Sequence, residues 1–194
     1  IFMEQGMPVI RELLDFLEDK DWYTARDHSR GVARIALALH DVLADTLPGH
    51  STDHDRNTLE IASLMHDIGK LWIPWSILNR LTPLWPRDFD VIKRHPGRGR
   101  RFMEELGFHD IGAIVGRHHE RPDGAGYPVG GDIGCTAGRI LAVADCYEAM
   151  TTPNRLYRKP LTPESAVRKM LSLSGRQFDD TVVNALPRAL QRLK

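Results

Sequence analysis

Apolar side chains recur three and four residues apart along most of this chain, the spacing that places them on one face of a helix. The clearest run predicts a long helix over about 23–47, ended by Pro48 and Gly49, and consists of Val32, Ile35, Ala36, Leu39, Val42 and Leu43. No segment alternates apolar and polar residues as a half-buried strand would. The pattern therefore predicts an all-α domain, folded as a helical bundle.

The same spacing, read with helix-start and helix-stop residues, predicts the remaining elements. They are a short helix after Pro8, helices over 59–67, 86–94 and 111–119, one around Phe102 that ends at Gly107, and helices over 136–150, from Thr162 and over 178–193. The stretch 122–136 holds five glycines and two prolines, so we expect a structured loop there.

Composition narrows the class of protein. With 194 residues the chain suits one domain, 1–194, with a core at about 22–180. Lysine and arginine total 26, as do aspartate and glutamate, so nothing favours DNA binding. Two cysteines form no disulfide framework, and no apolar run is long enough to span a bilayer, so we expect a cytoplasmic location. Since the first residue is Ile1, we expect a fragment of a longer multidomain signalling protein.

Seven residues of metal-ligand type stand in or beside apolar sequence, where an unpaired charge or imidazole costs several kcal/mol. Shared metal ions would remove that cost. The set is His28, His66, Asp67, His95, His118, His119 and Asp145. Nitrogen and oxygen donors of this kind suit two divalent ions such as iron or manganese. Asp67 could bridge ions about 3.5–4 Å apart, and such a pair generates hydroxide and clamps the oxygens of a displacement at phosphorus.

Each residue also has an ordinary structural interpretation. His28 alone would more often be a surface or core histidine, and His118–His119 could be either. Asp145, within an apolar helix, needs a partner. We expect the other histidines to be non-ligands: His40, His50, His54 and His109.

Lys70 follows Asp67 by three residues, which on a helical turn places the two side chains together. A fixed cation there could neutralise a phosphate oxygen as charge develops. Alternatively, it is a surface lysine at a helix C-terminus, stabilised by the helix dipole.

The combination of motifs resembles the HD-GYP domain, a subgroup of the HD phosphohydrolase superfamily. It comprises His66-Asp67 with Gly69-Lys70, then His118-His119-Glu120, and then Asp123-Gly124-Ala125-Gly126-Tyr127-Pro128. The resemblance runs from about 23 to 180 and implies an HD-type helical bundle with a Gly/Pro-rich GYP loop. It implies a cyclic di-GMP phosphodiesterase of bacterial signalling that yields pGpG and, in many relatives, GMP.

The resemblance also implies roles for residues. One metal ion would be held by His28, His66, Asp67 and Asp145; the second by Asp67, His95, His118 and His119, with Asp67 bridging. Lys70 would support phosphate binding and catalysis, while Arg155, Arg158 and Tyr127 would contact substrate. Some relatives bind a third metal through a glutamate where this chain has Thr24, so we expect two ions. A GGDEF domain could dock on the GYP loop, an upstream regulatory domain is expected, and a homodimer is a further expectation.

Three tryptophans have two interpretations. Trp72, Trp75 and Trp85 could stack on guanine, but we expect them to cover the core. Other functions also stay open. The substrate could be 3′,3′-cyclic GMP-AMP, the domain could be a weakly active module that binds a nucleotide or partner, or the metals could form a di-iron redox sensor. The complete ligand set and Lys70 favour the hydrolase.

Overall fold

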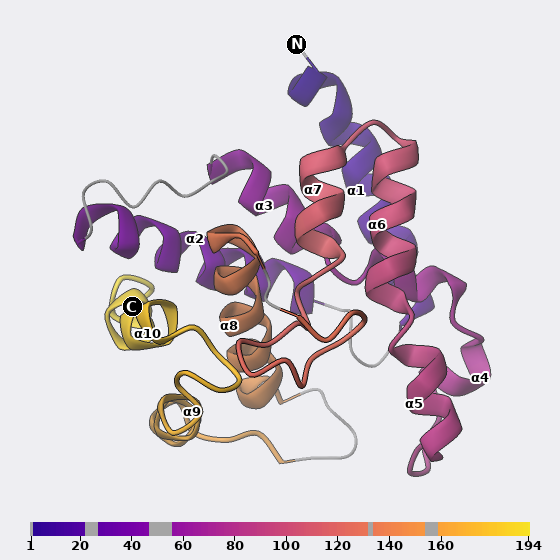
Figure 1. Ribbon diagram of the computed structural model, residues 1–194. Helices are drawn as coiled ribbons and strands as arrows, with labels where there is room; N and C mark the ends of the chain where they lie inside the picture. Colours follow the sequence, from indigo (N-terminus) through magenta and orange to yellow (C-terminus); the bar gives the residue numbers. More distant parts are fainter. Residues whose placement is uncertain (1, 22–26, 47–55, 132–133, 154–158) are drawn as a thin grey trace.

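The computed structural model describes residues 2–21, 27–46, 56–131, 134–153 and 159–194, and side chains from residue 8 onward. The helices in these ranges surround a centre formed by α2 and α8 (Figure 1). They are α1 (Phe2–Lys20), α2 (His28–Thr46), α3 (Arg56–Met65), the 3₁₀ helix η1 (Ile68–Trp72), α4 (Trp75–Leu78), α5 (Pro86–Ile92), α6 (His95–Glu105), α7 (His109–Val115), α8 (Thr136–Thr151), α9 (Pro163–Leu171) and α10 (Asp180–Gln191).

The all-α prediction is confirmed. Among the described residues the only strand-like feature is an isolated bridge between Ser174 and Phe178. None of the helices in the described ranges is long and apolar enough to cross a membrane.

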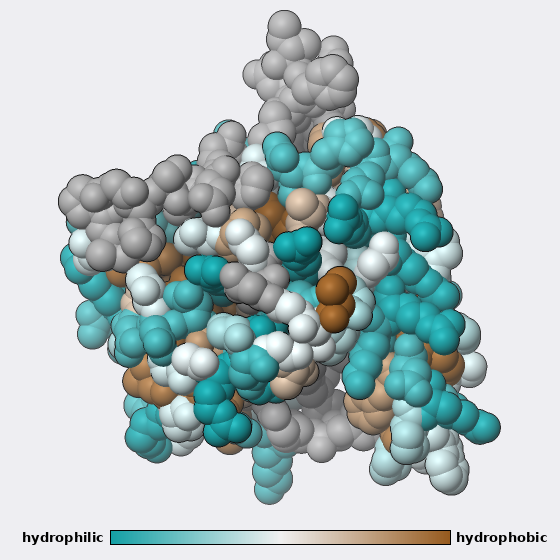
Figure 2. Space-filling model, in the orientation of Figure 1, coloured by the Kyte–Doolittle hydropathy of each residue, from teal (hydrophilic) through white to brown (hydrophobic). Residues whose placement is uncertain are grey.

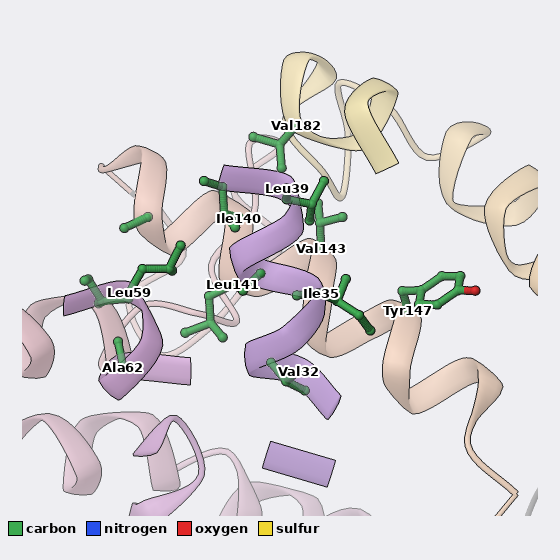
Figure 3. Close-up of a cluster of buried hydrophobic side chains, with 14 of the residues drawn as sticks. Val32, Ile35, Leu39, Leu59, Ala62, Ile140, Leu141, Val143, Tyr147 and Val182 are labelled. Carbon is green, nitrogen blue, oxygen red and sulfur yellow. The ribbon is translucent and has the colours of Figure 1, made fainter. Parts of the chain in front are cut away.

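The core forms where α2 packs against α3, α8 and α10. Figure 3 shows side chains of α2, among them Val32, Ile35 and Leu39, facing Ile140 and Leu141 of α8. Leu39 and Ile140 are fully buried, and burying one such aliphatic side chain contributes about 1.5–3 kcal/mol. This packing fixes α8 against α2, and both helices carry residues of the candidate site.

Two predicted helix starts are wrong. The first helix was predicted after Pro8 but begins at Phe2, because a proline removes one hydrogen bond and kinks a helix without always ending it. The long helix was predicted from about 23 but begins at His28: Asp27 has a φ of 63°, a left-handed conformation that no helix continues through. Residues 22–26 lie outside the described residues.

Six of the seven candidate ligands lie at helix ends, and Asp145 lies inside α8. His66 and Asp67 follow the end of α3, His118 and His119 follow α7, and His28 is the first residue of α2. His95 was expected at the end of a helix, but it begins α6 with Pro96 in the first turn, where a proline is favoured. Gly69 lies within η1.

Gly69 lets η1 and α6 approach closely. A Cβ atom at this position would lie 1.9 Å from the carbonyl oxygen of His95 and 2.7 Å from the amide nitrogen of Gly99. Because both neighbours are backbone atoms, neither could move aside without shifting α6. Gly69 therefore sets the distance between the Asp67 turn and His95.

We predict that Gly69→Ala lowers the free energy of unfolding by about 1–3 kcal/mol, the cost of overpacking a tight contact. Urea unfolding followed by circular dichroism measures it. Gly97→Ala is the matched control, since a Cβ there meets nothing within 4 Å, and it should be neutral or slightly stabilising. Equal stability of the two variants would contradict the assigned role of Gly69.

Candidate metal centre

The structure brings the seven predicted ligand residues together from five segments of the chain. Their ligand atoms form three overlapping groups, and within each group all the atoms lie within 4.8 Å of one another. The groups are His28, His66 and Asp67; His95, His118 and His119; and His66, His118 and Asp145. The third group joins the first two, so the seven residues make one continuous cluster.

Three histidine rings are oriented in the same way. The Nδ1 atoms of His66, His95 and His118 donate to the carbonyl oxygens of Ser63, Ile92 and Val115, at 2.8, 2.8 and 2.7 Å. A carbonyl only accepts, so Nδ1 carries the proton and Nε2 carries the lone pair. This is the arrangement that fixes a histidine as a metal ligand.

These lone pairs face one another. The Nε2 atoms of His95 and His118 lie 3.3 Å apart, and the buried Nε2 of His66 has no hydrogen-bond partner among the described residues. Burial lowers the pKa of His95 to about 3 and holds the pKa of His118 well below its usual value, so a proton does not resolve the contact. A metal ion between the two nitrogen atoms would resolve it, and the donor set fits one.

Asp67 lies between two sets of nitrogen atoms. Its Oδ1 is 3.2 Å from Nε2 of His95, and its Oδ2 is 3.3 Å from Nε2 of His66 and 3.9 Å from Nε2 of His28. Two atoms each about 2.1 Å from one ion lie roughly 3–3.5 Å apart, so these spacings suit shared ions. Each oxygen of Asp67 thus faces a different histidine group, as a bridging carboxylate must.

His28 is held between two carboxylates of α8. Its Nε2 is 3.1 Å from Oδ1 of Asp145, and its Nδ1 bonds to Glu148. Burial alone would lower the pKa of His28, but these hydrogen bonds raise it to about 9. Asp145 is also 3.8 Å from Nε2 of His66, and although burial opposes it, the hydrogen bond with His28 keeps the pKa of Asp145 low. A metal ion at this position would replace the proton on Nε2.

Lys70 contacts two carboxylates. Its Nζ lies 2.8 Å from Oδ2 of Asp67 and 3.0 Å from Oδ2 of Asp21, which follows α1 and is fully buried. Burial opposes the charge on Lys70, but Asp21 and Asp67 outweigh it and raise its pKa. Burial likewise opposes ionisation of Asp67, and Lys70 and His66 hold its pKa well below the usual value. Lys70 is therefore a fixed cation on the surface of the metal-centre cavity, not a solvent-exposed lysine.

The GYP loop, residues 123–128, folds back on the second histidine group. Tyr127 N donates to the carbonyl of His119 at 3.2 Å, and the two rings lie 4.7 Å apart at 31°. A Cβ at Gly126 would be 2.5 Å from that carbonyl, so only glycine fits. Buried Glu120 accepts hydrogen bonds from the amides of Val129, Gly130 and Gly131 at 2.6, 3.0 and 3.1 Å.

Not every predicted residue falls in this centre. Arg155 and Arg158 lie outside the described residues. The tryptophans do not cover the core as expected: Trp72, Trp75 and Trp85 are 47%, 61% and 61% exposed, because η1, α4 and α5 lie at the edge of the bundle. His109 is exposed and His40 pairs with Asp41, both away from the cluster, whereas His50 and His54 lie outside the described residues.

No role was predicted for Asp21, Glu120 or Glu148. Asp21 contacts Lys70, Glu148 contacts His28, and Glu120 binds backbone amides that follow the GYP loop. Glu148 follows Asp145 by three residues, so helical spacing alone could have indicated that both face His28. The contact between Asp21 and Lys70 spans 49 positions of sequence. Such a pairing depends on how α1 packs against η1, which no local pattern reports.

A helical domain with a His-Asp pair between further histidines is typical of HD-type metal-dependent hydrolases. The HD domain family matches residues 16–182, so this chain belongs to the HD domain family.

Individual relatives agree with this. The chain is 36% identical over 132 residues to the cyclic di-GMP phosphodiesterase response regulator RpfG of Xanthomonas campestris, covering 66% of this chain and 35% of that protein. It is 39% identical over 124 residues to a cyclic di-GMP phosphodiesterase of Thermotoga maritima, covering 61% and 33%. A solved cyclic GMP-AMP-specific phosphodiesterase of V. cholerae shares the fold, with a TM-score of 0.64 at 15% identity over 94% of this chain and 48% of that one. The chain thus spans about a third of the length of these two curated relatives.

We predict that a divalent metal stabilises the domain. When the free metal concentration is 100 times Kd, binding adds about 2.7 kcal/mol to the free energy of unfolding. For a chain of this size, that raises Tm by roughly 5–10 °C. Differential scanning calorimetry with Mn²⁺ and then with EDTA measures the shift. His118→Ala should lose most of it, and His109→Ala, on the exposed start of α7, should keep it. An equal shift in both variants would show that the metal binds elsewhere.

We also predict that Glu148→Ala weakens metal binding about 10–100-fold, the usual effect of removing the group that orients a ligand histidine. Glu148→Gln keeps an acceptor for Nδ1 of His28 and should lie close to the wild type. Isothermal titration with Mn²⁺ compares them, with exposed Glu12→Ala as the control. If Glu148→Gln and Glu148→Ala bound Mn²⁺ equally weakly, the charge of Glu148, and not its hydrogen bond with His28, would determine the metal affinity.

Proposed function

We propose that this domain is a metal-dependent phosphodiesterase of the HD-GYP type that hydrolyses cyclic di-GMP to pGpG; a second hydrolysis of pGpG would yield GMP. The observation that carries the proposal is the placement of Asp67, with one oxygen toward His95 and the other toward His66 and Lys70. The names of the two relatives support the substrate, and the complete ligand set supports turnover rather than a binding module.

The proposed ligands divide into two sets that share Asp67. One ion would be bound by His28, His66 and Asp145. The other ion would be bound by His95, His118 and His119. Iron and manganese suit this mixture of imidazole and carboxylate donors. When bound, the two ions would lower the pKa of water and offset the negative charge of a phosphodiester.

The chain's own residues would then act on the substrate. The cavity at the cluster measures about 530 Å³, enough for a nucleotide, and Lys70, Lys93 and Tyr127 line it together with the candidate ligands. Lys70, whose ammonium is fixed by Asp21 and Asp67, would face a phosphate oxygen and stabilise its charge as the bond to the 3′ oxygen breaks. Tyr127, stacked on His119, would form the wall against which the nucleotide lies.

The wider assembly is a prediction too. The chain would be one domain, 1–194, of a longer cytoplasmic signalling protein, with an upstream regulatory domain. Arg155 and Arg158 would contact substrate, GGDEF domains would dock on the GYP loop, and the domain could pair as a homodimer.

We predict that the iron- or manganese-loaded protein, incubated anaerobically with cyclic di-GMP, forms pGpG and GMP. Lys70→Ala should keep its metal and lose kcat by about two orders of magnitude, as when one electrostatic donor is removed. Asp67→Asn should abolish turnover because the charged bridge is lost. Chromatography of products and metal analysis of the same samples measure both effects.

Lys169→Ala, an exposed lysine on α9, is the control and should match the wild type. Wild-type activity in Asp67→Asn would exclude the two-metal proposal. Two bound metals without product from cyclic di-GMP, but with product from cyclic GMP-AMP, would reassign the substrate.

A further inference from the structure

A second cavity adjoins the metal centre. It measures about 790 Å³ and lies between η1, α6 and the GYP loop. Lys93 and Tyr127 line this cavity and also the metal-centre cavity. These two side chains therefore stand at the boundary, and the two cavities lie next to each other on either side of them.

The walls of the second cavity are strongly basic. Lys93, Arg94, Arg98 and Arg101 line it, against a single acid, Glu105. Within the described part of the chain, none of the four cations makes an ion pair, although the whole sequence is balanced at a net charge of +0. The excess is thus local to this face, and Figure 2 shows a largely hydrophilic surface over α6.

Arg94 and Arg98 stand at the start of α6, where a positive charge opposes the stability of the helix, whereas Arg101 lies further along it. Arg94 is the N-cap, and Arg98 and Arg101 follow at four and three residues, which places all three on one face. The start of a helix carries a partial positive charge, so cations there are unfavourable and an anion is favourable. An anionic ligand would remove this repulsion.

Aromatic side chains complete the cavity. Trp72 is 47% exposed, its ring lies 5.2 Å from that of Phe102, and Arg98 donates to its carbonyl oxygen at 2.6 Å. Tyr127 forms the opposite boundary, with Nζ of Lys93 5.9 Å from its ring centre. Nucleic-acid bases stack on such rings whatever their sequence, and guanidinium groups bind phosphate in bidentate fashion.

We propose that this second cavity holds the far nucleotide of a cyclic dinucleotide while its scissile phosphate lies at the metal centre. The inference rests on the proposed function. A cyclic dinucleotide carries two phosphates and two bases, and the metal centre accounts for one phosphate. The cations of α6 would bind the other phosphate, and Trp72 would stack on the base of the far nucleotide.

The test compares two substrates of the same holoenzyme. Bis(p-nitrophenyl) phosphate has no second nucleotide, whereas cyclic di-GMP has one. We expect Arg101→Glu to lower the ratio of kcat/KM for cyclic di-GMP to that for the small diester at least tenfold, chiefly through KM. Arg101→Lys should restore part of the ratio, and Arg34→Ala, an exposed arginine of α2 that lines neither cavity, is the matched control.

A binding measurement keeps the inference testable without turnover. Isothermal titration of the manganese-loaded protein with a hydrolysis-resistant phosphorothioate analogue of cyclic di-GMP should show at least tenfold weaker binding for Arg101→Glu and for Trp72→Ala. If the wild type hydrolyses neither substrate and binding is still weakened, the proposed hydrolysis fails and the cavity assignment stands.

Two results would overturn the assignment. One is unchanged KM and unchanged analogue binding in Arg101→Glu while the wild type hydrolyses cyclic di-GMP. The other is weaker binding of free GMP in this variant with no change in KM for cyclic di-GMP, which would make the cavity a separate nucleotide site.

Discussion

The buried carboxylate of Asp67 is the constraint on which the rest of the site depends. A negative charge removed from water costs several kcal/mol unless cations or hydrogen-bond donors surround it. Here Lys70 is the nearest fixed cation, at 2.8 Å, and Asp21 in turn balances Lys70 at 3.0 Å. Burial lowers the pKa values of His95, His118 and His119. Burial also opposes the charge on His28, but its hydrogen bonds with Asp145 and Glu148 raise its pKa to about 9, so Lys70 and His28 are the cations near Asp67. Adding divalent ions to such a carboxylate completes a balance that the protein side chains leave incomplete.

The fold delivers these groups by ending helices at one place. Side chains inside a helix point outward around its axis, whereas a residue just before or after a helix can project along it. His66, Asp67, His118 and His119 follow helices, and His28 and His95 begin them. Each of the turns that carry His66, His95 and His118 lets a ring bond back to the carbonyl three residues earlier, which fixes the ring before any metal arrives. Gly69 then permits two of these turns to meet without a side chain between them.

How much of this could be predicted from sequence follows from the range of each interaction. The helical spacing of α2 and α8 is local, so the all-α fold and most element positions could be predicted. The seven candidate ligands were picked out by residue type beside apolar sequence, and their convergence came from the resemblance to a known family. The spacing of apolar residues did not predict the helix starts near Pro8 and Asp27, because backbone conformation and not hydrophobicity determines them. It also failed for Asp21, because its contact with Lys70 exists only once α1 packs on η1.

The GYP loop shows why the candidate ligands and the rim of the site cannot vary independently. His119, in the second histidine group, also accepts the hydrogen bond from the amide of Tyr127 and stacks on its ring. The next residue, Glu120, is buried and binds three amides on the far side of the loop, so the loop is fixed at both ends by the residues that follow His118. A shift of this turn would therefore move a ligand atom and Tyr127 together. Since Tyr127 also lines both cavities, one short segment sets the positions of these candidate ligands and the shape of both cavities.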